Sequence, residues 1–299
     1  MELKFYQVDV FTQNPLGGNP LAVFVDATGL DTETMQKIAR EMNLSETTFV
    51  FPSSDDGADF DVRIFTPGKE LPFAGHPTLG TAHILREAGK ILEKENIIRL
   101  KMGVGIIPVH IEENGNRLFM EHPRPEFLQT QSSLDLVSAA LGLPSSAIDH
   151  RWPCQVVSTG LPALLVPLKN LESVRNIEGN LSTLKKMFAA LEIDMIYVFT
   201  LETVHNSYSV HSRLFAPFVG VPEDPATGSA SGALGAYLAQ HKVLDPEKLG
   251  DIKIEQGYEM GRPASIFVEV EETAGDIKSI RVGGESVTVI EGKLQIKSG

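Results

Sequence analysis

The stretch "RIFTPGKELPFAGHPTLGTAHIL", residues 63–85, has a counterpart later in the chain, "RLFAPFVGVPEDPATGSASGALGAYL", residues 213–238. Both contain a basic residue, a short apolar strand, a Phe-x-Pro break and an irregular loop. Each then continues with a glycine, a polar residue and a helix rich in small residues. The aligned pairs are Arg63 with Arg213, Phe65 with Phe215, Pro67 with Pro217 and, after a short insertion, Gly75-His76 with Gly228-Ser229. A repeat of this length predicts two homologous lobes.

The repeat extends upstream of both stretches. "GNPLAVFVD" at 18–26 resembles "TGLPALLVPL" at 159–168, and "TMQKIAREMNLSETTFVF" at 34–51 resembles "TLKKMFAALEIDMIYVF" at 183–199. Each half therefore shows an apolar strand, a helix of 3.6-residue period, a β-rich strand and the Phe-x-Pro strand. The predicted helices are Thr32–Met42, Pro77–Ala88, Ser182–Leu191 and Ala230–His241.

The helix from Pro77 and its counterpart from Ala230 are apolar on nearly all sides. A helix without a polar face is buried, so each is expected inside its own lobe and wrapped by sheet. Two prolines and polar residues in "EHPRPEFLQTQSS", 121–133, indicate the lobe boundary. We expect an N-terminal lobe over 1–125 and a C-terminal lobe over 126–285. The last strand, within 286–299, either completes the first lobe or closes the second.

Composition excludes several classes of protein. The 299 residues carry a net charge of −13 without a Lys/Arg cluster, which argues against a nucleic-acid partner. The lone Cys154 excludes an internal disulfide and a cysteine-based zinc cluster. The start, "MELKFYQVDVFT", is strand-like and unlike a signal peptide, and no apolar run approaches the roughly 20 residues that span a bilayer. We expect a cytoplasmic protein without a membrane partner.

Two glycine-led helix starts in matching positions indicate an anion site. Pro77 suits a first helical position, which predicts His76 as the N-cap, and a helix N-terminus keeps such a histidine neutral. The helix amides, pointing towards the space between the lobes, suit a substrate carboxylate. Gly75 and Gly228 let a ligand approach the backbone closely. The alternatives are that both glycines only permit turns and that His76 is a structural core histidine.

Asp224 and Ser229 are the polar candidates in the second repeat. Asp224 precedes Pro225 and can aim a carboxylate at the same centre, but it also fits a turn or N-cap role. Ser229 matches His76 in the repeat and also fits a plain helix cap.

The chain resembles the PhzF-like proteins of phenazine biosynthesis, whose fold is that of diaminopimelate epimerase. The resemblance covers essentially the whole chain and rests on a set of motifs that are specific in combination. These are "VDVFT…GNPLAVF", "LSETTFV", "FTP…ELPFAGHPTLGTA", "STGLPALLVPL", "FAPFVGVPEDPATGSASGALGAYL" and "QGYEMGRP". It implies an α+β fold of two pseudo-symmetric lobes, each a curled sheet around a central buried helix, with the active site between them.

The resemblance also implies the catalytic residues and the reaction class. The family's glutamate falls on Glu46 of Ser45-Glu46-Thr47, and its histidine, aspartate and serine match His76, Asp224 and Ser229. It implies catalysis without a metal or organic cofactor, in a homodimer, by an enzyme like trans-2,3-dihydro-3-hydroxyanthranilate isomerase. The residues alone do not select Glu46, because most glutamates are solvated. Its counterpart in the second repeat is expected around Asp194.

Three functions stay open. The first is an isomerase in which Glu46 moves a proton within a small unsaturated or cyclic carboxylic acid while His76 and Asp224 orient it. The second is an amino-acid racemase or epimerase with Glu46 opposed by His76 or Asp224. The third is a non-catalytic protein that binds a small anion. Racemisation by two thiols is excluded, because a serine is too weakly acidic to replace a thiolate.

Overall fold

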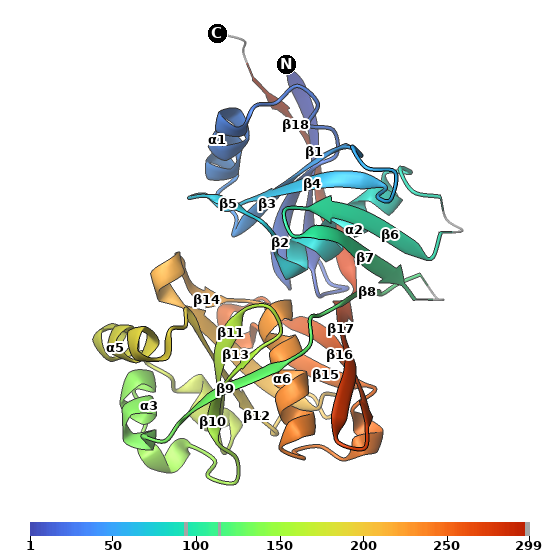
Figure 1. Ribbon diagram of the computed structural model, residues 1–299. Coiled ribbons are helices and arrows are strands. Elements are labelled where there is room, and N and C mark those ends of the chain that lie inside the picture. Colours follow the sequence, from blue (N-terminus) through green and yellow to red (C-terminus); the bar gives the residue numbers. More distant parts are fainter. Residues whose placement is uncertain (93–94, 113–114, 297–299) are drawn as a thin grey trace. The chain divides into compact units, whose positions relative to one another are not determined.

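The computed structural model describes residues 1–92, 95–112 and 115–296. The chain forms two compact units, Met1–Glu121 with Gly283–Gly299 and His122–Val282. Each unit contains a mixed sheet together with helices (Figure 1).

The sheet of the first unit runs in the order β18-β1-β2-β3-β4-β6-β7-β8, with β5 paired to β4. The β2–β3 and β4–β6 pairs are parallel and the others are antiparallel. The strands are β1 Glu2–Val10, β2 Asn19–Phe24, β3 Glu46–Pro52, β4 Phe60–Phe65, β5 Glu70–Leu71, β6 Ile97–Met102, β7 Gly105–Ile111, β8 Leu118–Glu121 and β18 Ser286–Gln295. The last strand of the chain therefore pairs with the first.

The second unit repeats this order as β9-β10-β11-β12-β13-β15-β16, with β14 paired to β13. The parallel pairs, β11–β12 and β13–β15, fall at the same places as in the first unit. The strands are β9 Glu126–Gln131, β10 Cys154–Ser158, β11 Pro162–Pro167, β12 Met195–Thr200, β13 Val210–Ala216, β14 Val221–Asp224, β15 Ile252–Gln256, β16 Ala264–Thr273 and β17 Asp276–Gly284. The prediction of two lobes with one topology is confirmed.

The helices include the four that were predicted, and three of these begin one or two residues earlier than predicted. They are α1 Thr32–Met42, α2 Gly75–Glu87, α3 Leu134–Leu141, α4 Leu171–Arg175, α5 Leu181–Leu191 and α6 Gly228–Gln240. The prediction of His76 as an N-cap is wrong, because Ala74 is the N-cap of α2 and His76 is its second residue. Pro77 is therefore the third residue of α2. Proline is tolerated at that position because the first four N–H groups of a helix have no intrahelical acceptor.

Both central helices are buried as predicted. Most residues of α2 and nearly all residues of α6 are inaccessible to solvent. Helix α2 packs on β1 and β2, and α6 packs on β16, β10 and β11. Gly80 makes the close approach of α2 possible, because a Cβ there would lie 2.7 Å from Cδ2 of Leu21 and 2.8 Å from Cγ2 of Val10.

Alternation along β3 places its side chains on two buried faces. Phe49 stacks on Phe24, with the ring centroids 5.1 Å apart, within an apolar cluster that includes residues of α1. Its neighbour Thr48 faces the other way and reaches Thr81 of α2, with 2.8 Å between the hydroxyl oxygens. Since strand side chains alternate, Glu46 projects on the same face as Thr48, towards α2.

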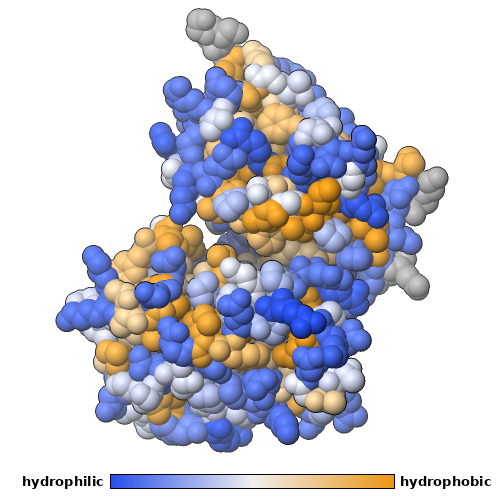
Figure 2. Space-filling model, in the orientation of Figure 1, coloured by the Kyte–Doolittle hydropathy of each residue, from blue (hydrophilic) through white to orange (hydrophobic). Residues whose placement is uncertain are grey.

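Hydrophilic and hydrophobic residues are interspersed on the visible surface (Figure 2). Leu16 and Leu92 are among the more exposed large apolar side chains, at 74% and 64%. Exposed apolar residues are ordinary on a folded protein, and these two assign no partner. Among the residues that the structure describes, none of the helices has the length and apolar character needed to span a bilayer.

Candidate active site

Glu46 and His76 meet in the first unit. Glu46 opens β3, where it pairs with Leu21 of the parallel strand β2, and His76 lies in the first turn of α2. Oε2 of Glu46 and Nε2 of His76 are 3.3 Å apart, and the side chains are 15% and 8% exposed. The structure therefore brings together two of the predicted catalytic residues, which are separated by 30 positions in the sequence.

The imidazole of this pair is neutral. Burial lowers the pKa of His76 from 6.5 to about 3. A neutral imidazole can donate one hydrogen bond to a carboxylate or accept one from a carboxylic acid. His76 can therefore contact the Glu46 carboxyl group whether that group is ionised or protonated, which suits a carboxyl group that takes up and returns a proton.

The low pKa of His76 predicts a pH dependence of stability. Between about pH 4 and 6 the unfolded state binds a proton at this histidine and the folded state does not, so stability falls as the pH falls. His76→Asn should reduce the slope of the free energy of unfolding against pH in this range by about 1.4 kcal/mol per pH unit. Urea unfolding of both proteins at pH 4.5, 5.5 and 7 measures it, and equal slopes would contradict the neutral imidazole.

The remaining candidates lie together at the start of α6 in the second unit. Asp224 ends β14, and one of its carboxylate oxygens accepts a hydrogen bond from the hydroxyl of Thr227, the N-cap residue of α6. Ser229 is the second helical residue and its carbonyl accepts from the hydroxyl of Thr159 at 3.3 Å. Neither Ala74 nor Thr227 caps its own helix start through a side-chain hydrogen bond.

The strand registers give a residue-by-residue equivalence between the units. Leu21 pairs with Glu46, and at the equivalent place Ala163 pairs with Met195. The equivalent of Glu46 is therefore Met195, and the expectation of a carboxylate around Asp194 is corrected, since Asp194 is an exposed residue just before β12.

The same comparison pairs the two helix starts. Leu71 and Asp224 occupy equivalent positions, because they pair with the matched residues Ile64 and Leu214. Counting onward without a gap makes Ala74 equivalent to Thr227 and confirms the match of His76 with Ser229. The equivalent positions are structurally alike but chemically different. Met195 and Ser229 match Glu46 and His76, and Leu71 and Ala74 match Asp224 and Thr227.

Cys154 takes no part in this chemistry. It is a buried residue of β10, and burial raises the pKa of its thiol to about 12. A thiol in that environment does not form the thiolate that a cysteine base needs.

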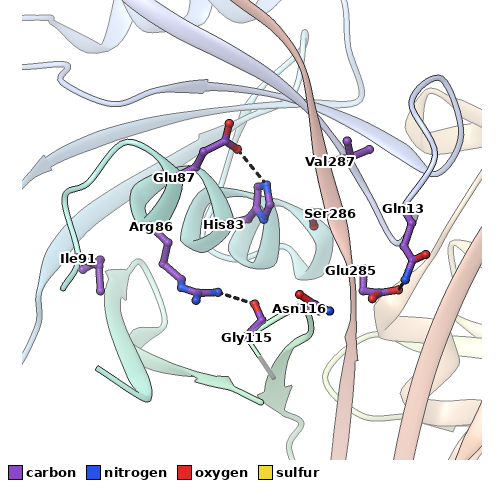
Figure 3. Close-up of a pocket in the computed structure, with 10 residues that line it drawn as sticks. All are labelled: Gln13, His83, Arg86, Glu87, Ile91, Gly115, Asn116, Glu285, Ser286 and Val287. Atoms are coloured by element: carbon purple, nitrogen blue, oxygen red, sulfur yellow. Dashed lines mark hydrogen bonds and ion pairs between the residues drawn. The ribbon is translucent and has the colours of Figure 1, made fainter. Parts of the chain in front are cut away.

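A cavity of about 720 Å³ lies at the other end of α2 (Figure 3). Its lining includes His83, Arg86 and Glu87, and none of the predicted site residues. Nη1 of Arg86 donates to the carbonyl of Gly115 at 2.8 Å, and Nε2 of His83 lies 3.2 Å from Oε2 of Glu87. Each of these three side chains already contacts a neighbouring group of the protein, so we place the candidate active site at Glu46 and His76.

The fold and this site define an α+β protein of two repeated units in which a carboxylate faces a neutral imidazole at the start of a buried helix. Comparison with known proteins identifies the family. The family model described as phenazine biosynthesis-like protein matches residues 8–292, so the chain belongs to that family.

Several relatives are named as isomerases. The trans-2,3-dihydro-3-hydroxyanthranilate isomerase of Pseudomonas aeruginosa is 36% identical over 98% of this chain and 99% of its own length. A crystal structure of a Bacillus anthracis phenazine biosynthesis protein of the PhzF family matches 99% of this chain and 100% of that chain, at 32% identity and a TM-score of 0.89. The chain is an isomerase of this family.

One further solved structure shows the breadth of the fold. The crystal structure of a hydroxyproline epimerase from Agrobacterium vitis matches 98% of this chain and 92% of that chain, at 10% identity and a TM-score of 0.65. At that identity the match shows the fold alone.

Sequence reasoning missed one part of the second unit. The buried side chains of Tyr197 and Gln256 join Thr227 and Asp224 in one hydrogen-bonded network. The available signal was the motif "QGYEMGRP", which begins at Gln256 but indicated only the family.

Proposed function

We propose that this isomerase shifts a proton within a small unsaturated or cyclic carboxylic acid, with Glu46 as the group that carries the proton. In the reaction a C–H bond of the substrate breaks and the proton moves to the Glu46 carboxylate. The electron pair moves through the adjacent double bond, and the proton returns to a different carbon. The contact of Glu46 with a neutral, buried His76 carries this proposal, because it gives the carboxyl group a partner in both protonation states.

The two units carry different residues at equivalent positions, and this difference favours a mechanism with a single proton-carrying carboxylate over one with two opposed bases. Racemases invert a centre with two bases on opposite faces, and such a mechanism suits a pair of equivalent residues, one from each repeat. Here the equivalents of Glu46 and His76 are Met195 and Ser229, and neither acts as a base at neutral pH. Return of the proton by the same carboxylate gives an isomerase, whereas the racemase alternative requires Asp224 as the second base.

We assign supporting roles to the other candidates. Asp224 and Ser229 are proposed to orient the substrate, and the amides of the residues from Gly75 and Gly228 onward to hold its negative charge. Binding of one anion by both helix starts stays a prediction. We also propose that the protein acts in the cytoplasm, as a homodimer, in a biosynthetic reaction.

Incubation in deuterated water tests the reaction class. The first substrate to use is trans-2,3-dihydro-3-hydroxyanthranilate, on which the P. aeruginosa relative acts by name. We expect a product with its double bond moved, carrying deuterium at the carbon that accepts the proton to the extent that the Glu46 carboxyl exchanges with solvent before it returns the proton. Single enantiomers of proline and of diaminopimelate serve as the comparison, and inversion of either would replace the proposal with the racemase alternative. Tight binding of small carboxylates without exchange in any of them would favour the anion-binding alternative.

A further inference from the structure

The amide of Gln256, at the end of β15, uses its full hydrogen-bonding capacity. Its side chain is completely buried. Nε2 donates to the carbonyl oxygen of Asp224 at 2.7 Å and to Oγ1 of Thr227 at 3.1 Å. Oε1 accepts from the hydroxyl of Tyr197 at 3.0 Å and from the backbone N–H of Thr227 at 3.2 Å. All four hydrogen bonds that a primary amide can make are therefore formed.

These bonds hold the segment that carries the second unit's candidates. Gln256 binds the backbone at both Asp224 and Thr227, and the hydroxyl of Thr227 donates in turn to the Asp224 carboxylate. Tyr197 extends the network to Ser231 in the first turn of α6, with 3.0 Å between the hydroxyl oxygens. We call Tyr197, Asp224, Thr227, Ser231 and Gln256 the Gln256 network.

The first unit has the same backbone arrangement without this amide. Phe60 pairs with Leu100 and its equivalent Val210 pairs with Ile254, so two residues further on Met102 is equivalent to Gln256. Met102 is buried, and its Sδ lies 3.5 Å from Oγ1 of Thr78 in α2. A buried glutamine is therefore not needed to close a sheet around a helix start of this kind.

A glycine follows Gln256 in one unit and Met102 in the other. In both units the end of the strand lies so close to the proline loop that a Cβ at this glycine would clash with it. Gly257 has a φ of +81°, and a Cβ there would lie 2.5 Å from the carbonyl oxygen of Pro225. At the equivalent Gly103 a Cβ would lie 2.9 Å from Cα of Pro72. The strand end packs against the proline loop in both cases, and only the second unit adds a hydrogen-bonding amide.

We infer that Gln256 is a positioning residue, which holds the Asp224 carboxylate and the first turn of α6 in the arrangement that binds the substrate. The inference rests on the proposed role of Asp224 in orienting the substrate, and it adds Gln256 as the group that sets the position of the Asp224 carboxylate. Gln256 acts through Asp224 and Thr227 and does not itself exchange a proton.

Hydrogen–deuterium exchange tests the positioning without any need for turnover. Gln256→Met installs the residue found at the equivalent place, and Gln256→Glu keeps the shape and the acceptor while removing both donors. Each should speed amide exchange across 221–234 about tenfold or more and leave the equivalent segment 68–81 as in the wild type. Met102→Leu is the matched control and should leave 221–234 unchanged. Wild-type exchange of 221–234 in both Gln256 variants would overturn the inference.

A double-mutant cycle tests whether Gln256 acts through Asp224. In the wild-type background Gln256→Met should lower kcat about 10²-fold, the cost of a misplacement near 1 Å. In an Asp224→Asn background the same change should cost less than about threefold, because the group it positions is already lost. Equal losses in both backgrounds would mean a general structural effect and would overturn the inference. If wild-type protein turns over none of the carboxylates, the proposed function fails and the exchange experiment alone decides the positioning.

Discussion

Glu46→Gln is expected to lower the rate of substrate proton exchange by about 10²–10⁴-fold, and by more if the same carboxyl also returns the proton. The variant keeps the size of the side chain and its ability to hydrogen-bond, but an amide cannot accept a proton from carbon at neutral pH. Since Glu46 is a partly buried residue at the start of β3, the fold and the ligand affinity should change little. Deuterium incorporation at saturating substrate measures the loss.

Two comparisons isolate the role of Glu46. Glu41→Gln, on the exposed face of α1, removes a carboxylate elsewhere in the same unit and should keep full activity. His76→Ala should damage both affinity and rate, because it removes the neutral partner of Glu46 and alters the first turn of α2. Nearly full exchange in Glu46→Gln would show that the assigned role is wrong and would make Asp224 the next candidate base.

Arg213→Met is expected to destabilise the second unit by about 3–5 kcal/mol, because it leaves a largely buried carboxylate without its partner. Arg213 is 8% exposed, and its guanidinium donates to both oxygens of Glu223 at 2.8 and 2.9 Å. It also donates to the carbonyl of Val174 at 2.9 Å. The methionine keeps most of the apolar stem, so the loss reports mainly on the charge and its hydrogen bonds.

The repeat supplies the control for this prediction. Arg63 binds both oxygens of Glu70 in the same way, at 2.7 and 2.6 Å, but the two side chains are 33% and 39% exposed. Solvent screens such a pair, so Arg63→Met should cost only about 0–1 kcal/mol. Urea unfolding at pH 7, followed by circular dichroism and by the fluorescence of the single tryptophan, Trp152, compares the two variants. Equal costs would contradict the assignment of the difference to burial.

Local signals predicted those features that depend on neighbouring residues. Helix α1 spans Thr32–Met42 as predicted, because Asp31 caps its start by accepting from the N–H of Thr34 at 2.7 Å and Asn43 ends it in the left-handed region. The burial of α2 and α6 followed from their lack of a polar face. The early start of α2 was missed, because a proline fits any position whose N–H has no helical acceptor.

The choice of Glu46 came from the family resemblance, and the residues alone did not supply it. A glutamate before a strand is usually solvated, and only the parallel register with β2 and the packing of α2 place this one beside His76. The expected counterpart around Asp194 was wrong by one residue, and in a strand one residue decides which face a side chain occupies. Register depends on pairing between distant segments, so a gapped internal alignment could not settle it.

The sequence by itself determined the repeat, the strand and helix order within each unit and the burial of one small-residue helix in each. These features follow from composition, periodicity and local backbone preference. Only the tertiary structure decided which polar groups meet, such as Glu46 with His76 and Gln256 with Tyr197, which is 59 residues away. A hydrogen bond requires atoms to lie within about 3 Å, and that distance is set by long-range packing and register that local patterns do not encode.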